Sequence, residues 1–195
     1  MQFPLKLTFK IMALAPQISV HDANGTLLFY VKQKMFKLKE AITVFSDQSQ
    51  SQALYTISAD RIIDFSARYH FKDQNGIEIG SIKRDGARSI WKARYSIFDS
   101  NEQMVMQIQE ENAWVKVMDA VFGEIPLLGI LSGYVFNPVF LIERPDDSLM
   151  LRVKKEPAFL ESSFVIDKVA EISEAEQLNT VLGILMMVLL ERSRG

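Results

Sequence analysis

The chain has 195 residues, of which 48% are hydrophobic and 24% are charged, a composition typical of folded globular proteins and not of disordered or fibrous ones. Its formal net charge is −2, which excludes a global positive field that recruits nucleic acid and leaves only local patches as electrostatic sites. The absence of cysteine excludes disulfides, thiol nucleophiles and thiolate metal sites, and fits a reducing compartment. We therefore expect one cytoplasmic domain over residues 1–195, with no nucleic acid partner.

The N-terminal segment, MQFPLKLTFKIMALAPQ, has a superficial similarity to a secretory signal. Lys10 interrupts its apolar run, which is too short for the hydrophobic region of such a signal. We interpret the segment as a first β-strand.

A repeat organises residues 17–110. Four aspartates, Asp22, Asp47, Asp73 and Asp99, follow one another at intervals of 25 to 26 residues, and each ends a short run of alternating character. An aspartate followed by small polar residues or glycine is typical of a tight hairpin turn. The alternation of apolar and polar residues between the turns indicates strands with one buried and one wet face, as in an antiparallel meander. Propellers and solenoids also repeat, but with other lengths or simpler units.

The pattern changes after residue 111. Trp114, Val117, Met118 and Val121 stand at helical spacing, which predicts a short helix over residues 112–122. The stretch 121–142 is almost entirely apolar, but Pro126 and several glycines interrupt it, which disfavours a membrane span. Contact of this stretch with lipid stays open as an alternative.

Strands resume towards the C-terminus, with a turn at Pro145–Ser148 and a last strand over Ser163–Ile172. A helix follows from Glu174 to Arg194, with Ser173 as its capping residue. Between Val181 and Leu190 this helix has no polar side chain, so it has no wet face. An apolar run of this length spans roughly 15 Å, about half the core of a bilayer. We therefore expect a helix buried in protein, with membrane insertion as the alternative.

These elements combine into one fold. About a dozen antiparallel strands and one wholly apolar helix predict a mainly β protein, a closed antiparallel barrel with the C-terminal helix as its core. Closure removes the exposed strand edges that an open sheet would present.

Two parts of the chain resemble a known superfamily. The run YVKQKMFKLKEAITVFSDQSQSQALYTISADRI, followed by FKDQNGIEIGSIKR, is similar to the start of a LURP-one-related protein. The later run GYVFNPVFLIERPDDSLMLRVKKEPAFLESSFVI and the closing LLERSRG resemble the bacterial phospholipid-scramblase-related branch. Both groups share the Tubby C-terminal-like fold, so the resemblance implies a twelve-stranded closed barrel around a hydrophobic helix, which the repeat and the terminal helix predict independently.

The resemblance also implies kinds of ligand. Tubby-type domains bind phosphoinositide head groups through basic residues on the barrel surface, and scramblases carry a calcium loop before their C-terminal helix. The comparable stretch here, DKVAEISEAEQ, lacks the alternating Asp and Asn ligands and the turn glycine of a calcium loop. We therefore expect a lipid ligand without a metal or another cofactor.

Three groups of basic residues are candidates for binding an anion, because clustered cations attract phosphate and anionic membranes. A solvated strand face is the alternative for the first two groups; in the first, the lysines would discourage edge pairing, and in the second, Asp85 would pair with the cations. The first candidate group consists of Lys32, Lys34, Lys37 and Lys39; the second of Lys83, Arg84 and Arg88, with Lys92 and Arg94 nearby; and the third of Arg152, Lys154 and Lys155.

Signals of catalysis are weak. His21 and His70 occupy polar strand positions beside turns, and Ser132 in GILSG stands one place too late for a nucleophile elbow. No glycine-rich phosphate loop or dinucleotide fingerprint is present in the sequence. We expect a non-enzymatic protein that binds an anionic lipid head group or membrane surface, peripheral to the membrane. The alternative is a protein-interaction or regulatory scaffold with a protein partner and no lipid ligand.

The central helix can be tested by Leu185→Asp. This change places a charge without a partner at the centre of the barrel, so we expect the chain not to fold. Circular dichroism and thermal unfolding of the purified variant measure this. A soluble variant that unfolds cooperatively would contradict the buried position of the helix.

Overall fold

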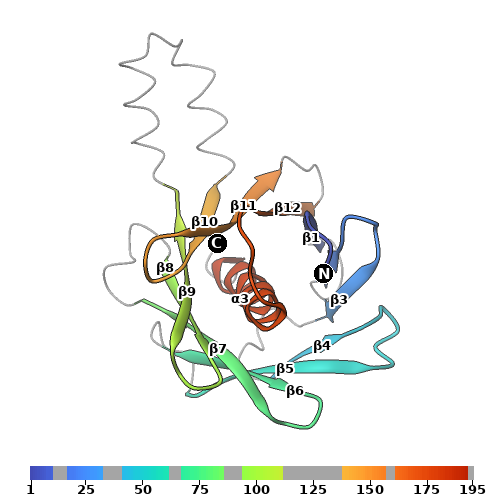
Figure 1. The fold of residues 1–195 in the computed structure, drawn as a ribbon. Coiled ribbons are helices and arrows are strands. Elements are labelled where there is room, and N and C mark those ends of the chain that lie inside the picture. Colours follow the sequence, from blue (N-terminus) through green and yellow to red (C-terminus); the bar gives the residue numbers. More distant parts are fainter. Residues whose placement is uncertain are drawn as a thin grey trace.

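The structure is a computed structural model, and it describes residues 1–10, 17–32, 41–61, 67–85, 94–111, 138–156 and 161–192. Within these ranges, twelve antiparallel strands close into a barrel around one C-terminal helix, α3 (Figure 1). The predicted fold class is therefore confirmed. The elements are β1 (Leu5–Lys10), β2 (Gln17–His21), β3 (Leu27–Lys32), β4 (Ile42–Phe45), β5 (Ala53–Ala59), β6 (Arg68–Asp73), β7 (Glu78–Arg84), β8 (Arg94–Asp99), β9 (Met104–Glu110), β10 (Val139–Glu143), β11 (Leu149–Glu156), β12 (Glu161–Lys168) and α3 (Glu174–Arg192).

Each strand pairs with the next one in the chain, and β1 pairs with β12 to close the barrel. The closing pair runs from Leu5 opposite Ile166 to Lys10 opposite Glu161. Because the first and last strands are neighbours, side chains far apart in sequence lie side by side on this wall.

The helix α3 fills the barrel. Side chains from Val181 to Met187 are at most 1% exposed where they are apolar, and they pack with inward-facing residues of the strands. No helix in the described part of the chain has the length and apolar character to cross a membrane. The predicted last strand, Ser163–Ile172, ends earlier, at Lys168. It ends there because the chain bends over the barrel, where the N–H groups of Val169 and Ala170 both donate to the Met150 carbonyl.

A capping box begins the helix. The Glu176 carboxylate accepts hydrogen bonds from the Ser173 N–H (2.9 Å) and hydroxyl (2.8 Å), while the Ser173 hydroxyl oxygen accepts one from the Glu176 N–H at 3.3 Å. Arg144, in the turn between β10 and β11, forms an ion pair with Glu176 at 3.1 Å. This end of α3 is thereby tied to the barrel wall.

Tight turns join the strands at the end of the barrel where α3 begins. The carboxylates of Asp22, Asp73 and Asp99 each accept hydrogen bonds from the N–H groups two and four residues later, all at 2.9 Å. Asp47 holds its turn through Ser49 and Ser51. The predicted hairpin tips are therefore turns of one kind, each with a residue of positive φ in third place after the aspartate.

The helix comes closest to β7 and β8, and two glycines permit this. A Cβ atom on Gly80 would lie 2.6 Å from the Phe98 carbonyl oxygen and 2.7 Å from the Asn179 amide nitrogen. On the helix, a Cβ atom on Gly183 would lie 2.8 Å from Cδ1 of Ile97. The helix axis is therefore displaced towards the β7–β8 wall.

Two predictions lie largely outside the described residues. The short helix expected over residues 112–122 lies entirely outside the described residues. Residues 121–137 of the apolar stretch 121–142 also lie outside them. The remainder of that stretch forms most of β10, where Phe140 and Ile142 face the core.

The close contact at Gly80 can be tested by Gly80→Ala. The added methyl group meets a backbone carbonyl that cannot move freely, so we expect the free energy of unfolding to fall by about 1–3 kcal/mol. Urea denaturation measures the loss. Asn179→Ala removes one of the two groups that the added methyl group would meet. In that background, Gly80→Ala should therefore cost less stability. An equal cost in both backgrounds would contradict the proposed geometry.

The capping carboxylate predicts a dependence of stability on pH. Burial works to raise the pKa of Glu176, but the Ser173 N–H and hydroxyl and the Arg144 guanidinium lower this pKa overall. A pKa that is lower in the folded chain stabilises the fold above the unfolded value, about 4, and this contribution is lost as the pH falls through the folded value. We expect Glu176→Gln to be less stable than the wild type at neutral pH, and the difference to shrink below about pH 4.

Urea denaturation across this pH range measures both proteins. Glu174→Gln is a matched control, since Glu174 is an exposed carboxylate in the same turn of the helix. A difference between Glu176→Gln and the wild type that stays constant on acidification would show that the carboxylate charge is not the stabilising feature.

Candidate functional site

The structure separates the predicted basic residues. Lys32 is exposed at the end of β3, while Lys83 and Arg84 end β7. Strands β4, β5 and β6 lie between β3 and β7 in the barrel, so the first and second groups do not form one surface. Lys34, Lys37, Lys39 and Arg88 lie outside the described residues.

Arg84 points into the barrel. It shares the inner face of β7 with Ile82, and only 12% of its side chain is exposed. Its guanidinium lies 5.9 Å from the centre of the Tyr95 ring and 4.0 Å from the Glu191 carboxylate near the end of α3. Arg84 is thus a partner of the helix and not a residue of the outer surface.

The Tyr95 hydroxyl completes this cluster by donating a hydrogen bond to the Glu191 carboxylate. Burial raises the pKa of Tyr95 strongly, and the hydrogen bond to Glu191 raises it further. The phenol therefore stays protonated and serves as a donor. Arg84, Tyr95 and Glu191 together hold the C-terminal end of α3 against the β7–β8 wall.

A different set of cations gathers on the wall where the barrel closes. Gln17 on β2 is paired with Lys10 of β1 on one side and with Lys32 of β3 on the other. Lys6 on β1 and Lys154 on β11 flank Val165 of β12 in the same way. We call this set the lysine face; it consists of Lys6, Lys10, Lys32 and Lys154, all exposed.

The lysine face extends over five neighbouring strands, from β11 through β12, β1 and β2 to β3. Partners two strands apart are about 10 Å from each other, and Lys6 and Lys10 are about 13 Å apart along their strand. Between the two lysine pairs lie the small buried side chains of Thr8, Ser19 and Ser163.

Within the described residues, none of the four lysines forms an ion pair. Three acidic residues of the described chain are near: Glu161 stands opposite Lys10, Glu156 accepts a hydrogen bond from Ser163 at 3.5 Å, and the exposed Asp167 lies two residues beyond Val165 on the outer side of β12. The face keeps a positive balance, since four lysines stand against these three carboxylates.

The third predicted group divides among three environments. Arg152 lies 3.8 Å from the Glu111 carboxylate, Lys154 belongs to the lysine face, and Lys155 lines the inside of the barrel. Sequence reasoning missed Lys6 and Lys10, although their alternation with the buried Leu5, Leu7 and Phe9 marks them as outward. Their proximity to Lys154 follows only from the pairing of β1 with β12.

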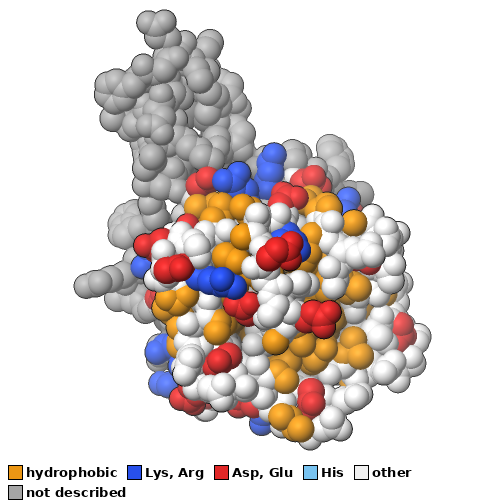
Figure 2. All heavy atoms as spheres, in the orientation of Figure 1, with side chains coloured by type: hydrophobic (Ala, Val, Ile, Leu, Met, Phe, Trp, Pro, Cys, Tyr) orange, Lys and Arg blue, Asp and Glu red, His pale blue; other side chains and the backbone are white. Residues whose placement is uncertain are grey.

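The acidic residues have a different distribution. Asp22, Asp47, Asp73, Asp99 and Asp146 all lie in the turns at one end of the barrel. In Figure 2, acidic side chains are spread over the face turned to the viewer, and most Lys and Arg side chains lie nearer its rim. The turns thus form an acidic end, and the lysine face belongs to the side wall.

The histidines do not suggest a catalytic centre. Nδ1 of His70 lies 2.7 Å from the Glu78 carboxylate across the β6–β7 hairpin, on the outer side of the sheet. In the described part of the chain, no three His, Asp or Glu side chains converge to hold a metal ion.

Comparison with known proteins places the chain among relatives. The sequence profile of LURP-one-related proteins matches residues 27–183. The chain belongs to the LURP-one-related family. A protein of Arabidopsis thaliana with an X-ray structure is similar to this chain with a TM-score of 0.47 and 15% sequence identity, over 95% of this chain and 91% of that one. A search among curated proteins gave no match.

Membership in the LURP-one-related family agrees with the first resemblance and with the barrel seen here. The family match spans the strands from β3 to β12 and the first half of α3. The similarity of the second half of the chain to scramblase-related proteins stays a prediction.

Proposed function

We propose that this LURP-one-related protein is a non-catalytic, peripheral binding protein that docks on anionic membrane surfaces through its lysine face. The observation that carries the proposal is the position of Lys6, Lys10, Lys32 and Lys154, which are exposed on one wall and have no ion pair among the described residues. Each lysine near an anionic leaflet contributes about 1 kcal/mol to binding, so that four contribute about 4 kcal/mol.

The charge distribution also supports an orientation. The turns carry a ring of aspartates, which an anionic surface repels, whereas the β11–β12–β1–β2–β3 wall carries the lysines. We infer that the side wall faces the membrane and that the acidic end does not. The cytoplasmic leaflet is the anionic one in cells, which agrees with the cytoplasmic location expected from the sequence.

Vesicle flotation tests the proposal. The wild type is mixed with vesicles of phosphatidylcholine alone and of phosphatidylcholine with phosphatidylserine, at low and moderate salt. We expect flotation only with the anionic vesicles, and less of it as salt rises, because salt screens exposed charges. Lys6→Glu with Lys10→Glu should weaken binding by about tenfold or more, since each change removes one favourable charge and adds a repulsive one.

A matched control reverses two cations on the opposite wall. Lys72 on β6 and Lys83 on β7 lie across the barrel from β1, and Lys72→Glu with Lys83→Glu changes the net charge by the same amount. Equal losses in both double variants would show that only net charge matters, and the lysine face would not be the docking site.

The alternative function, a protein-interaction or regulatory scaffold, predicts a different outcome in the same experiment. The protein then stays unbound to vesicles at every salt concentration, and the lysine changes have no effect. Thermal unfolding of each variant shows whether a loss of binding comes from a loss of folded structure. We expect no such loss, since these lysines do not contribute to the core.

A further inference from the structure

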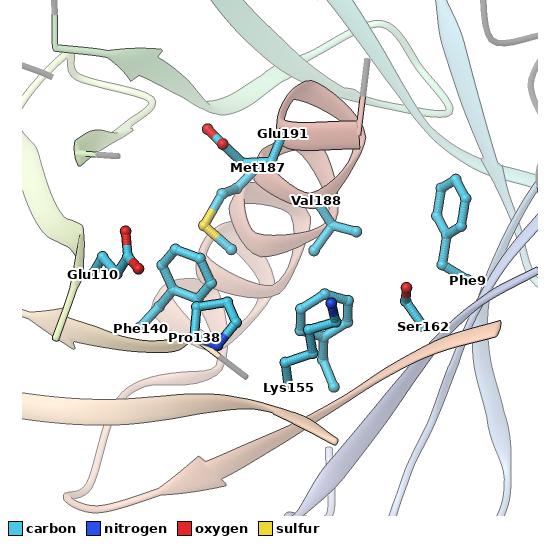
Figure 3. Close-up of a pocket in the computed structure, with 10 residues that line it drawn as sticks. Phe9, Glu110, Pro138, Phe140, Lys155, Ser162, Met187, Val188 and Glu191 are labelled. Carbon is cyan, nitrogen blue, oxygen red and sulfur yellow. The ribbon is translucent and has the colours of Figure 1, made fainter. Parts of the chain in front are cut away.

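A pocket opens inside the barrel near the C-terminal end of α3. Its volume is about 300 Å³, and it lies between the helix and the wall formed by β1 and β9 to β12 (Figure 3). Its lining combines apolar side chains with a few charged ones: Phe9, Glu110, Pro138, Phe140, Lys155, Ser162, Phe164, Met187, Val188 and Glu191.

The space exists because α3 is displaced from the barrel axis. Gly80 and Gly183 bring the helix against β7 and β8. On the other side of the helix, Met187 and Val188 face strands that do not approach as closely, and the gap between them is the pocket.

The apolar part of the lining resembles a site for a small amphiphilic molecule. Three phenylalanines, Phe9, Phe140 and Phe164, surround the gap together with Met187 and Val188. Ligand pockets combine such an apolar lining with a few polar groups that fix the orientation of the ligand. A cavity of about 150 Å³ holds one benzene ring, so this pocket has room for about twelve non-hydrogen atoms.

Lys155 supplies the charge. It shares the inner face of β11 with Leu151 and Val153, both fully buried, and its side chain extends into the pocket (Figure 3). Its ammonium group makes no hydrogen bond or ion pair within the described part of the chain. A half-buried cation without a partner is unfavourable, and a bound anion would provide the missing partner.

The two carboxylates of the lining do not fill this role. Glu191 accepts the hydrogen bond of Tyr95 and lies 4.0 Å from Arg84, so its charge is compensated on the far side of the helix. Glu110 has contacts of its own, and in Figure 3 Phe140 and Pro138 stand between it and Lys155. In Figure 3, Ser162 of β12 lies beside Lys155 in the lining, and its hydroxyl can also donate to an anion.

We propose that this pocket binds an amphiphilic carboxylate of about twelve non-hydrogen atoms, with its carboxylate against Lys155 and Ser162 and its apolar body against Phe9, Phe140 and Phe164. The site is distinct from the lysine face. Lys154 and Lys155 are neighbours on β11, but the first points out of the barrel and the second points in.

The test measures binding of soluble probes to the full chain by isothermal titration calorimetry. Decanoate and phenylbutyrate have the proposed size and charge, with an aliphatic and an aromatic body respectively, and they distinguish the two kinds of apolar group. Decanol and decyltrimethylammonium are the neutral and cationic comparisons. We expect decanoate to bind most tightly, and the cationic probe to bind weakly or not at all.

Two variants separate the head-group contact from the apolar cavity. Lys155→Met keeps the length of the side chain but removes its charge, so it should weaken decanoate binding by about tenfold or more and leave decanol binding unchanged. Met187→Trp fills the pocket and should abolish binding of both. Lys154→Met is the matched control and should leave decanoate binding as in the wild type.

Several results would overturn the proposal. Absence of decanoate binding to the wild type would remove the site, and equal decanoate affinities of the wild type and Lys155→Met would remove the role of the ammonium group. Tighter binding of the cationic probe would show that Glu110 and Glu191 govern the pocket. Vesicle flotation of Lys155→Met should equal that of the wild type, so failure of this proposal and failure of membrane docking are distinguishable.

Discussion

The whole structure depends on one requirement: the apolar surface of α3 must be kept from water on every side. From Val181 to Leu189 the helix is buried, and an open sheet would cover only one face of it. Twelve strands that close through the β1–β12 pair supply a continuous wall. The polar side chains of the helix stand at its two ends, before Val181 and after Leu190. In the first turns the Asn179 amide donates to the Ile79 carbonyl at 2.9 Å, and the Gln177 amide donates to the Ile172 carbonyl.

A second constraint, the position of α3 inside the barrel, determines where the interior is closely packed and where a pocket remains. Close packing at Gly80 and Gly183 fixes the helix against β7 and β8, and the Arg84–Tyr95–Glu191 cluster fixes its end on the same side. The opposite wall then carries both candidate binding regions, the lysine face on its outer side and the pocket on its inner side. Because side chains alternate along its strands, this wall has a basic outer surface and a largely apolar inner surface. The neighbours Lys154 and Lys155 lie on the outer and the inner side respectively.

Much of this fold could be predicted from local patterns. The aspartate turns, the alternation within strands and the capped apolar helix are all set by residues close together in sequence, and together they predicted the closed barrel. The candidate site was less accessible. Lys6 and Lys154 come together only through the closing strand pair, which no local pattern marks, and the eccentric position of α3 depends on glycines in two distant elements. The inward direction of Arg84 and Lys155 was readable from their alternation with Ile82 and Val153, but their charge favoured a surface interpretation.

The order of the elements along the chain has a consequence for biosynthesis. The helix that fills the barrel follows all twelve strands, and the strand that closes the barrel is the last of these. During translation, strands β1 to β11 are therefore synthesised before the closing strand and the core helix, and their apolar side chains have no helix to pack against. Until then β1 and β11 each lack a neighbouring strand, and the inner faces of all eleven strands have no helix to cover. Exposed apolar surface and unpaired strand edges of this kind promote association with other chains or with chaperones. This topology delays closure of the barrel until β12 and α3 have been synthesised.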